Sequence, residues 1–170
     1  AHGSLPEPTA TPRSWGTDPY PSPAERYGVL RDAARGDLSA EQILAELKES
    51  GLRGMGGAGF PTGTKWDLVR KEPASPKYVV CNADEGEPGT FKDRVVLEEM
   101  PHLVIEGMAL AALVTGAEKG IVFIRHEYVA ERVALERALE EARRRGALGD
   151  NALGAGKRFD VEVFVSPGGY

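Results

Sequence analysis

Cysteine is almost absent from this sequence, with Cys81 the only one among 170 residues. A single cysteine excludes an internal disulfide framework and any zinc or iron–sulfur site built wholly from the cysteines of this chain. The three histidines are scattered along the sequence, so we predict no metal site. Because Cys81 ends an apolar run, we expect a buried, unreactive thiol.

Long apolar runs and an excess of positive charge are missing as well. The longest apolar stretch, from Leu103 to Leu113, is interrupted by Glu106 and Gly107, so it is too polar for a membrane span. With 21 basic and 26 acidic side chains, the net charge of −5 does not suit binding to nucleic acid. The first residues also lack the basic-then-apolar order of a signal peptide. We therefore expect a cytoplasmic protein, free or held at the cytosolic face of a membrane through a complex, without direct membrane insertion.

Proline is concentrated at the beginning of the chain, where residues 1–23 hold six of the 12 prolines. Such a segment favours an extended conformation. We therefore expect residues 1–37 to form an extended arm, either mobile or laid along a partner. Hydrophobic residues make up 41% of the whole sequence and charged residues 28%, which is typical of a folded domain. We assign that domain to residues 38–170.

Helix-like and strand-like patterns alternate through this domain. The apolar spacing over 40–50 predicts a short amphipathic helix, with Ser39 as its N-cap and Gly51 after its end. The patterns predict strands over 77–81, 120–124 and 160–165, and helices from 66, over 101–115 and over 128–145. Alternation of this kind predicts an α/β fold with a Rossmann-like parallel sheet in the order βαβαβ. An N-terminal helix and a glycine-rich loop precede the sheet.

The glycine-rich loop lies between residues 51 and 66. Its glycines are Gly51, Gly54, Gly56, Gly57, Gly59 and Gly63. No regular element needs so many, so the backbone here passes close to another group. Residues 54–59 formally satisfy G-x-G-x-x-G, but they follow an expected helix instead of a strand, unlike the usual dinucleotide-binding motif. On this pattern alone, a ligand-binding loop and a structural turn both remain open.

Polar turns follow the three expected strands at 82–89, 125–127 and 166–170, at the edge where open parallel sheets bind ligands. The first turn places Asp84, Glu85 and Glu87 within four residues. These carboxylates repel one another unless cations, hydrogen-bond donors or solvent relieve them. Their spacing does not match a calcium loop. A ligand site and a solvated acidic turn are both compatible with the residues.

Taken together, the segments 50–66 and 81–94 resemble the NADH-binding flavoprotein subunit of respiratory complex I. They also resemble the same type of subunit, the diaphorase subunit, in NAD-dependent formate dehydrogenases and NAD-reducing hydrogenases. The similarity extends from about Leu38 to Tyr170. It implies a domain that binds FMN and NAD(H), in which hydride passes from NADH to FMN and single electrons then pass to iron–sulfur clusters.

The resemblance also implies roles for individual residues. Glu87 matches an acidic residue beside the nicotinamide and is the expected catalytic residue, and Phe60 is expected to stack on adenine. The remaining expected cofactor-binding residues are Gly54, Gly56, Lys65, Asn82, Asp84, Glu85, Gly86 and Tyr170 on the FMN side, Gly57 and Ala58 on the NADH side, and Gly59 in the same glycine-rich loop.

Three departures from the family pattern stand out. Met55 replaces an arginine found in many members, and Leu68 replaces an aromatic residue that helps to hold adenine in some. The chain also stops at Tyr170, before the ubiquitin-like domain and the helical domain whose cysteines hold a four-iron cluster. We therefore expect the N-terminal part of a longer NADH dehydrogenase subunit, whose partners are iron–sulfur electron-transfer subunits. The alternative is a truncated nucleotide- or flavin-binding module, or a docking fragment, without turnover.

Overall fold

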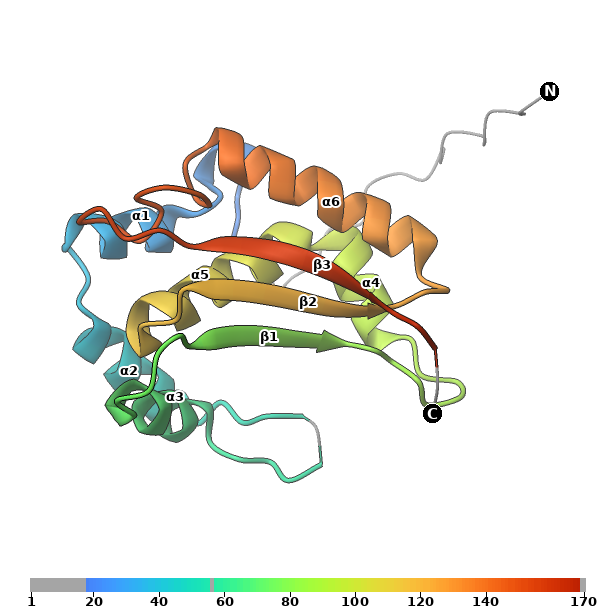
Figure 1. The fold of residues 1–170 in the computed structure, drawn as a ribbon, viewed down its shortest axis with the longest axis horizontal. Coiled ribbons are helices and arrows are strands. Elements are labelled where there is room, and N and C mark those ends of the chain that lie inside the picture. Colours follow the sequence, from blue (N-terminus) through green and yellow to red (C-terminus); the bar gives the residue numbers. More distant parts are fainter. Residues whose placement is uncertain (1–17, 56, 169–170) are drawn as a thin grey trace.

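A computed structural model describes residues 18–55 and 57–168, and Figure 1 shows their arrangement. A short 3-10 helix, Pro23–Glu25, begins the described part. The elements that follow are α1 (Gly28–Arg35), α2 (Ala40–Glu49), α3 (Thr62–Lys71), β1 (Tyr78–Ala83), α4 (Lys92–Glu99), α5 (Pro101–Thr115), β2 (Lys119–Arg125), α6 (Val129–Arg144) and β3 (Asp160–Ser166).

The three strands form one parallel sheet in the order β1-β2-β3. Asn82 in β1 is in register with Phe123 in β2, and Phe123 with Phe164 in β3. Helices α4 and α5 connect β1 to β2, and α6 connects β2 to β3. The predicted Rossmann-like βαβαβ fold is therefore confirmed, and the carboxyl ends of all three strands meet at one edge.

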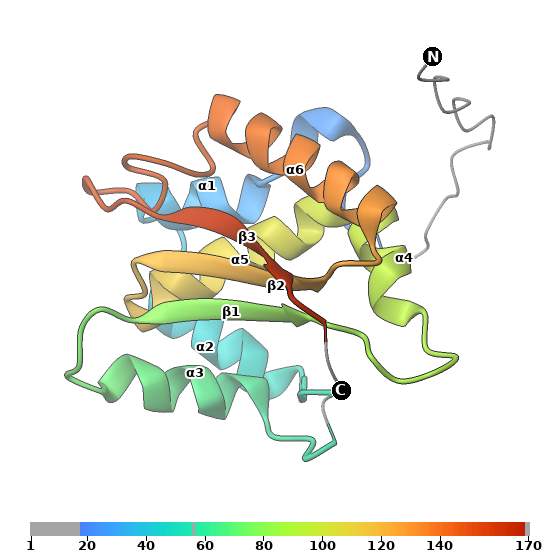
Figure 2. The same ribbon diagram turned by 45° about the vertical axis from the view of Figure 1, so that its right-hand side comes forward.

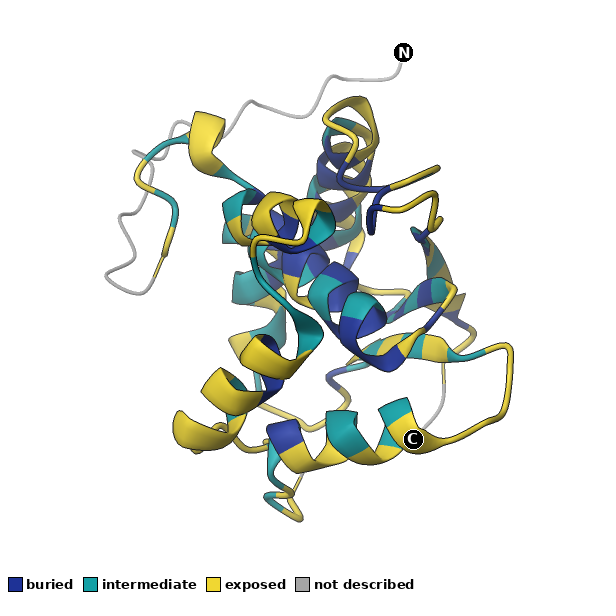
Figure 3. Ribbon diagram, turned by 90° about the vertical axis from the view of Figure 1, so that its left-hand side faces the viewer, coloured by how far each residue is buried: buried dark blue, intermediate teal, exposed yellow. Residues whose placement is uncertain are grey.

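The main hydrophobic core lies on one face of the sheet. Val122, Ile124 and Val161 are fully buried there, under α5, which packs against β1 and β2, and α6, which packs against α5. Figure 3 shows the buried residues gathered between these helices and the strands. Gly120 allows the close packing, because a Cβ at this position would lie 2.8 Å from a Val161 methyl group. Helices α5 and α6 thus cover one face of the sheet.

The other face of the sheet carries exposed apolar side chains. Tyr78 and Val80 in β1 are 53% and 60% exposed, and Phe164 in β3 is 54% exposed. The ring of Phe123 stacks on that of Phe164, with 5.6 Å between their centroids. We call these four residues the open sheet face. Parallel sheets usually have both faces covered, so this face is unusual for its class.

The expected extended arm over 1–37 is wrong for the part that the structure describes, residues 18–37. Helix α1 forms there, and its N-cap Tyr27 and its Leu30 are each only 1% exposed. The backbone amide of Leu30 donates a hydrogen bond to Glu106 Oε1 in α5 at 3.0 Å. The prolines of residues 1–23 favoured the prediction of an extended arm, although a short apolar stripe follows them in α1 and packs on α5. Residues 1–17 lie outside the described residues.

Helix α4 was not predicted. Its only buried side chain is Leu97, so residues 92–99 carry little of the apolar periodicity by which helices are recognised in a sequence. The N-cap residue, Phe91, makes no side-chain capping bond. The helix is instead held at its start by a carboxylate from the loop after β1.

Candidate functional site

A cleft of about 920 Å³ lies beyond the carboxyl end of β1. Figure 2 shows the two segments that border it, the loop before α3 and the loop after β1, at the same end of the sheet. Its lining residues are Met55, Gly57, Asn82, Asp84, Glu85, Gly86, Glu87, Pro88, Thr90, Lys92 and Asp93. The fold therefore brings the glycine-rich loop and the acidic turn together around one space.

The glycine-rich loop is closed at its base by backbone hydrogen bonds. The amide of Gly54 donates to the carbonyl of Phe60 at 2.9 Å, and that of Thr62 donates to the carbonyl of Leu52 at 2.9 Å. At the tip, Gly57 has φ +96°, which side-chain-bearing residues rarely adopt, and nothing lies within 4 Å of its missing Cβ. At the tip of the loop, the backbone of Gly57 is therefore exposed to the cleft without a side chain.

The acidic turn starts directly after β1. The Asp84 amide donates to Asn82 Oδ1 at 3.1 Å, and the Gly86 amide donates to the Asp84 carbonyl at 2.9 Å. Asn82 and Glu87 are exposed, whereas Asp84 is half-buried. Within the described part of the chain, the carboxylates of Asp84 and Glu87 have no ion-pair partner. Two of the three acidic side chains are thus available to a ligand.

The third carboxylate, that of Glu85, is buried. Burial opposes its ionisation, but hydrogen bonds from the Asp93 amide and the Tyr128 hydroxyl outweigh this effect, so its pKa lies below the ordinary value. Burial, together with the bond to Glu85, raises the pKa of Tyr128 to about 12. Glu85 is therefore ionised and Tyr128 is protonated at neutral pH.

The turn after β2 also reaches the acidic turn. Arg125 donates from Nη1 to the backbone carbonyl of Glu85, and its guanidinium pairs with Glu127, with 2.7 Å between Nη2 and Oε1. This hydrogen-bonded pairing lowers the pKa of Glu127 to about 2. The segment after β3 joins them, since a Cβ on Gly168 would lie 3.1 Å from Cε1 of His126. The expected meeting of three segments at this edge is confirmed as far as residue 168.

The expected site residues fall into three groups in the structure. Gly57, Asn82, Asp84, Glu85, Gly86 and Glu87 line the cleft. Gly54, Ala58, Gly59, Phe60 and Lys65 lie in the adjacent loop and at the start of α3, but they do not line it. Gly56 and Tyr170 lie outside the described residues.

Sequence reasoning missed other lining residues, namely Met55, Pro88, Thr90, Lys92 and Asp93. All of them except Met55 belong to the motif that begins at Cys81, and this motif is the signal by which they could have been found. Met55 lines the cleft with an 83% exposed side chain.

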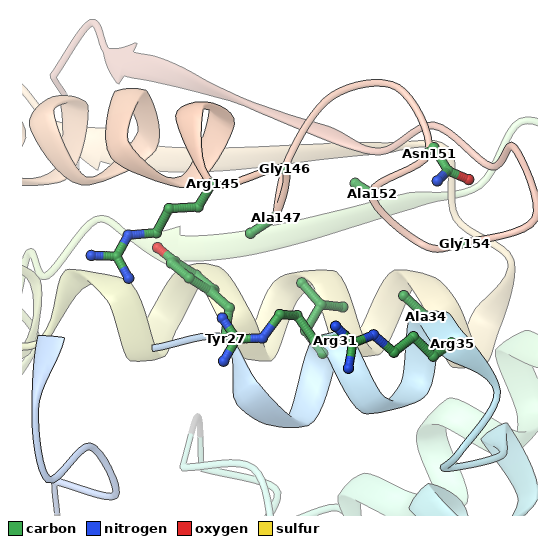
Figure 4. Close-up of a pocket in the computed structure, with 11 residues that line it drawn as sticks. Tyr27, Arg31, Ala34, Arg35, Arg145, Gly146, Ala147, Asn151, Ala152 and Gly154 are labelled. Carbon is green, nitrogen blue, oxygen red and sulfur yellow. The ribbon is translucent and has the colours of Figure 1, made fainter. Parts of the chain in front are cut away.

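A second, smaller cavity of about 170 Å³ lies between α1 and the loop that follows α6 (Figure 4). Arg31 and Arg35 from α1 and Arg145 from the end of α6 border it. It contains none of the motif residues. Because its loop leads into the start of β3, the cavity belongs to the amino-terminal edge of the sheet, opposite the cleft.

Two further findings concern metal and membrane binding. Among the described residues, no three His, Cys, Asp or Glu side chains are grouped so that they could hold a metal ion. None of the helices described is both long and apolar enough to span a bilayer.

The parallel sheet with a glycine-lined cleft at its carboxyl edge defines a nucleotide-binding type of α/β domain. Residues 47–170 match the Nuo51 FMN-binding domain, and the chain belongs to this family. This match confirms the family resemblance that was inferred from the two motifs.

Relatives of the chain include components of two oxidoreductases. It is 50% identical over 144 residues to an NADH-quinone oxidoreductase subunit of Rhizobium meliloti (strain 1021), covering 85% of this chain and 34% of the relative. It is also 50% identical over 135 residues to the alpha subunit of the NAD-reducing hydrogenase HoxS of Cupriavidus necator, covering 78% of this chain and 22% of the relative. The chain therefore spans about a third or less of the length of these curated relatives.

A solved structure supports the same assignment. The NAD+-reducing NiFe-hydrogenase in its H2-reduced state contains a region with a TM-score of 0.68 and 42% sequence identity to this chain. The match covers 76% of this chain and 22% of that one.

Proposed function

We propose that this chain forms the FMN- and NADH-binding part of an NADH-oxidising flavoprotein subunit. The observation that carries the proposal is the shared cleft: the tip of the glycine-rich loop and the acidic turn, distant in sequence, line one space of about 920 Å³. Both segments lie within the region that matches the Nuo51 FMN-binding domain.

The cleft suits a flavin nucleotide in size and in chemistry. Cofactor sites typically enclose about 300–1,000 Å³, so this volume accommodates FMN and part of a dinucleotide beside it. The Asn82 amide and the Thr90 hydroxyl are suited to bind the ribityl hydroxyls. Gly57 allows a flat ring to approach the backbone, because no side chain occupies that position.

The charges of the cleft favour one orientation of the cofactor. Asp84 and Glu87 repel a phosphate group, so we place the phosphate on the side of the glycine-rich loop, which leads into α3 and Lys65 just outside the cleft lining. FMN, when bound, supplies the ability to accept a hydride and to release electrons singly. Asp84 and Glu87 raise the free energy of negative charge added to the cleft, and so tune the potential at which the cofactor is reduced.

Electron delivery involves protein outside this chain. We propose that the electrons pass to iron–sulfur clusters, of which a four-iron cluster belongs to the full-length subunit and others to partner subunits. The relatives named above are subunits of an NADH-quinone oxidoreductase and of an NAD-reducing hydrogenase. We further propose that the assembly works in the cytoplasm or at the cytosolic face of a membrane.

An FMN titration followed by anaerobic addition of NADH tests the proposal. Saturable quenching of flavin fluorescence, followed by bleaching of the oxidised flavin band, is expected if these residues hold both cofactors in a reactive arrangement. Quenching without bleaching indicates a flavin-binding module that lacks turnover by itself. The absence of saturable binding refutes the proposal for this chain.

A further inference from the structure

Glu85 differs from the other acidic residues of the cleft because its carboxylate is turned into the protein. The side chain is only 2% exposed. Its Oε2 accepts a hydrogen bond from the Asp93 amide at 2.8 Å, and Lys92 Nζ lies 3.7 Å from the same oxygen. Its Oε1 accepts a bond from the Tyr128 hydroxyl at 2.8 Å and one from the Arg94 amide at 3.5 Å. Both oxygens are thus occupied by donors of the protein.

These bonds give α4 the cap that its own N-terminus lacks. The first amides of a helix have no partner inside the helix, and a side-chain oxygen usually satisfies them. Phe91, at the N-cap position of α4, offers no such oxygen. Glu85 replaces it from the preceding loop, and its negative charge is favourable at this end of the helix dipole. The acidic turn is thereby fixed to α4.

Tyr128 extends the connection to the segment after β2. The guanidinium groups of Arg94 and Arg125 both lie over its ring, 5.3 Å and 5.5 Å from the ring centroid. Arg94 Nε also donates to the buried Glu131 at 2.9 Å, so it is held on both sides. Tyr128 does not line the cleft. It acts on the acidic turn only through Glu85 and the arginines.

We infer that Glu85 is a positioning residue whose carboxylate does not contact the flavin. Its carboxylate fixes the acidic turn to α4 and to the start of α6, and so holds Asp84 and Glu87 at the cleft. This inference rests on the proposed function for what the cleft binds. Contact with a cofactor would require the Glu85 carboxylate to give up its hydrogen bonds from the Asp93 amide and the buried Tyr128 hydroxyl. The two neighbouring carboxylates are free of this constraint.

Hydrogen exchange of individual amides tests the positioning without any cofactor. Glu85→Gln is expected to raise the exchange rate of the Asp93 amide by about tenfold, since a bond to an ionised acceptor is replaced by a weaker one. The control Glu49→Gln, at an exposed position in α2, is expected to leave this rate unchanged. An unchanged rate in Glu85→Gln overturns the inference.

FMN binding by Glu85→Gln, Tyr128→Phe and the double variant then separates positioning from contact. We expect Tyr128→Phe to weaken FMN binding about threefold, and the double variant to lose less affinity than the product of the two single losses, because both act through one connection. Tyr78→Phe, which removes an exposed hydroxyl from β1, is the control. Wild-type FMN affinity in Tyr128→Phe, with a large loss in Glu85→Gln, overturns the inference and assigns Glu85 to the flavin. If the unaltered chain binds no FMN, the proposed function fails, while the exchange rates still decide whether Glu85 fixes the turn.

Discussion

The hydroxyl of Tyr27 in the described N-terminal segment lies 2.5 Å from Nδ1 of His102 in α5. Both side chains are buried, and the rings meet edge to face with their centroids 5.7 Å apart. Burial and the nearby Arg26 guanidinium lower the pKa of His102 to about 4, although Glu141 opposes this shift. The segment that contains the 3-10 helix Pro23–Glu25 and α1 is therefore attached to α5 through a neutral imidazole.

This pairing predicts that the chain loses stability in mild acid. Because the folded pKa is below the unfolded value of about 6.5, the unfolded chain binds the proton more readily between these values. Stability is complete above about pH 6.5 and falls by roughly 2–3 kcal/mol as the pH drops toward 4. Urea unfolding at several pH values measures the effect. The variant His102→Gln, which retains a hydrogen-bonding side chain, should show a shallower acid dependence. An identical dependence in both proteins contradicts the assignment.

Gly154 provides a test of how the loop after α6 packs on α1. A Cβ at this position would lie 1.9 Å from the backbone oxygen of Ala34, and φ is +76°. We expect Gly154→Ala to destabilise the fold by about 3 kcal/mol or more, since backbone atoms must move. Gly156 is the matched control, because it has φ +78° but open space around the missing Cβ. Its alanine variant should cost only about 1 kcal/mol. Equal losses in thermal unfolding would show that the close approach is not formed in solution.

The sheet and helices α5 and α6 were predictable because the apolar residues of these elements repeat with a clear period. Helix α5 is apolar around much of its surface, and β2 alternates regularly between buried and half-buried positions. Helices α1 and α4 carry few buried side chains, Leu30 and Ala33 in one and Leu97 in the other, and were missed. Their stability depends on tertiary partners, which local periodicity does not reveal.

The candidate site also has a part that the sequence predicted and a part that it did not. The glycine-rich loop and the acidic turn were identifiable as motifs, and their meeting at one edge followed from the parallel sheet. The sequence does not distinguish Glu85 from Glu87, two identical side chains two residues apart. Their different exposure is decided by donors from α4 and by Tyr128, which is 43 positions away in the sequence from Glu85. A sequence motif does not predict contacts between residues so far apart in the chain.

Glu87 carries a prediction about the redox properties of the cleft. Its exposed carboxylate disfavours added negative charge, so Glu87→Gln should shift the midpoint potential of bound FMN to a more positive value. A change of about 1 kcal/mol corresponds to about 20 mV for a two-electron couple. Anaerobic redox titration of the FMN-loaded chain measures the shift, and NADH affinity is followed alongside. Glu98→Gln in α4, which lies outside the cleft, is the charge-matched control. If neither the midpoint potential nor the NADH affinity changes in Glu87→Gln, the prediction is wrong and this carboxylate does not tune the cofactor.

The open sheet face predicts self-association of the isolated chain. Tyr78, Val80, Phe123 and Phe164 form an apolar surface on a class of sheet that is normally covered on both sides. Burying this surface against a second copy removes apolar area from water, so the sedimentation coefficient should rise with protein concentration. The double variant Val80→Thr, Phe164→Thr should remain monomeric at concentrations where the original chain associates. Val133→Thr removes a partly exposed apolar side chain from α6 and is the control. Association that persists unchanged in the double variant would place the contact elsewhere on the molecule.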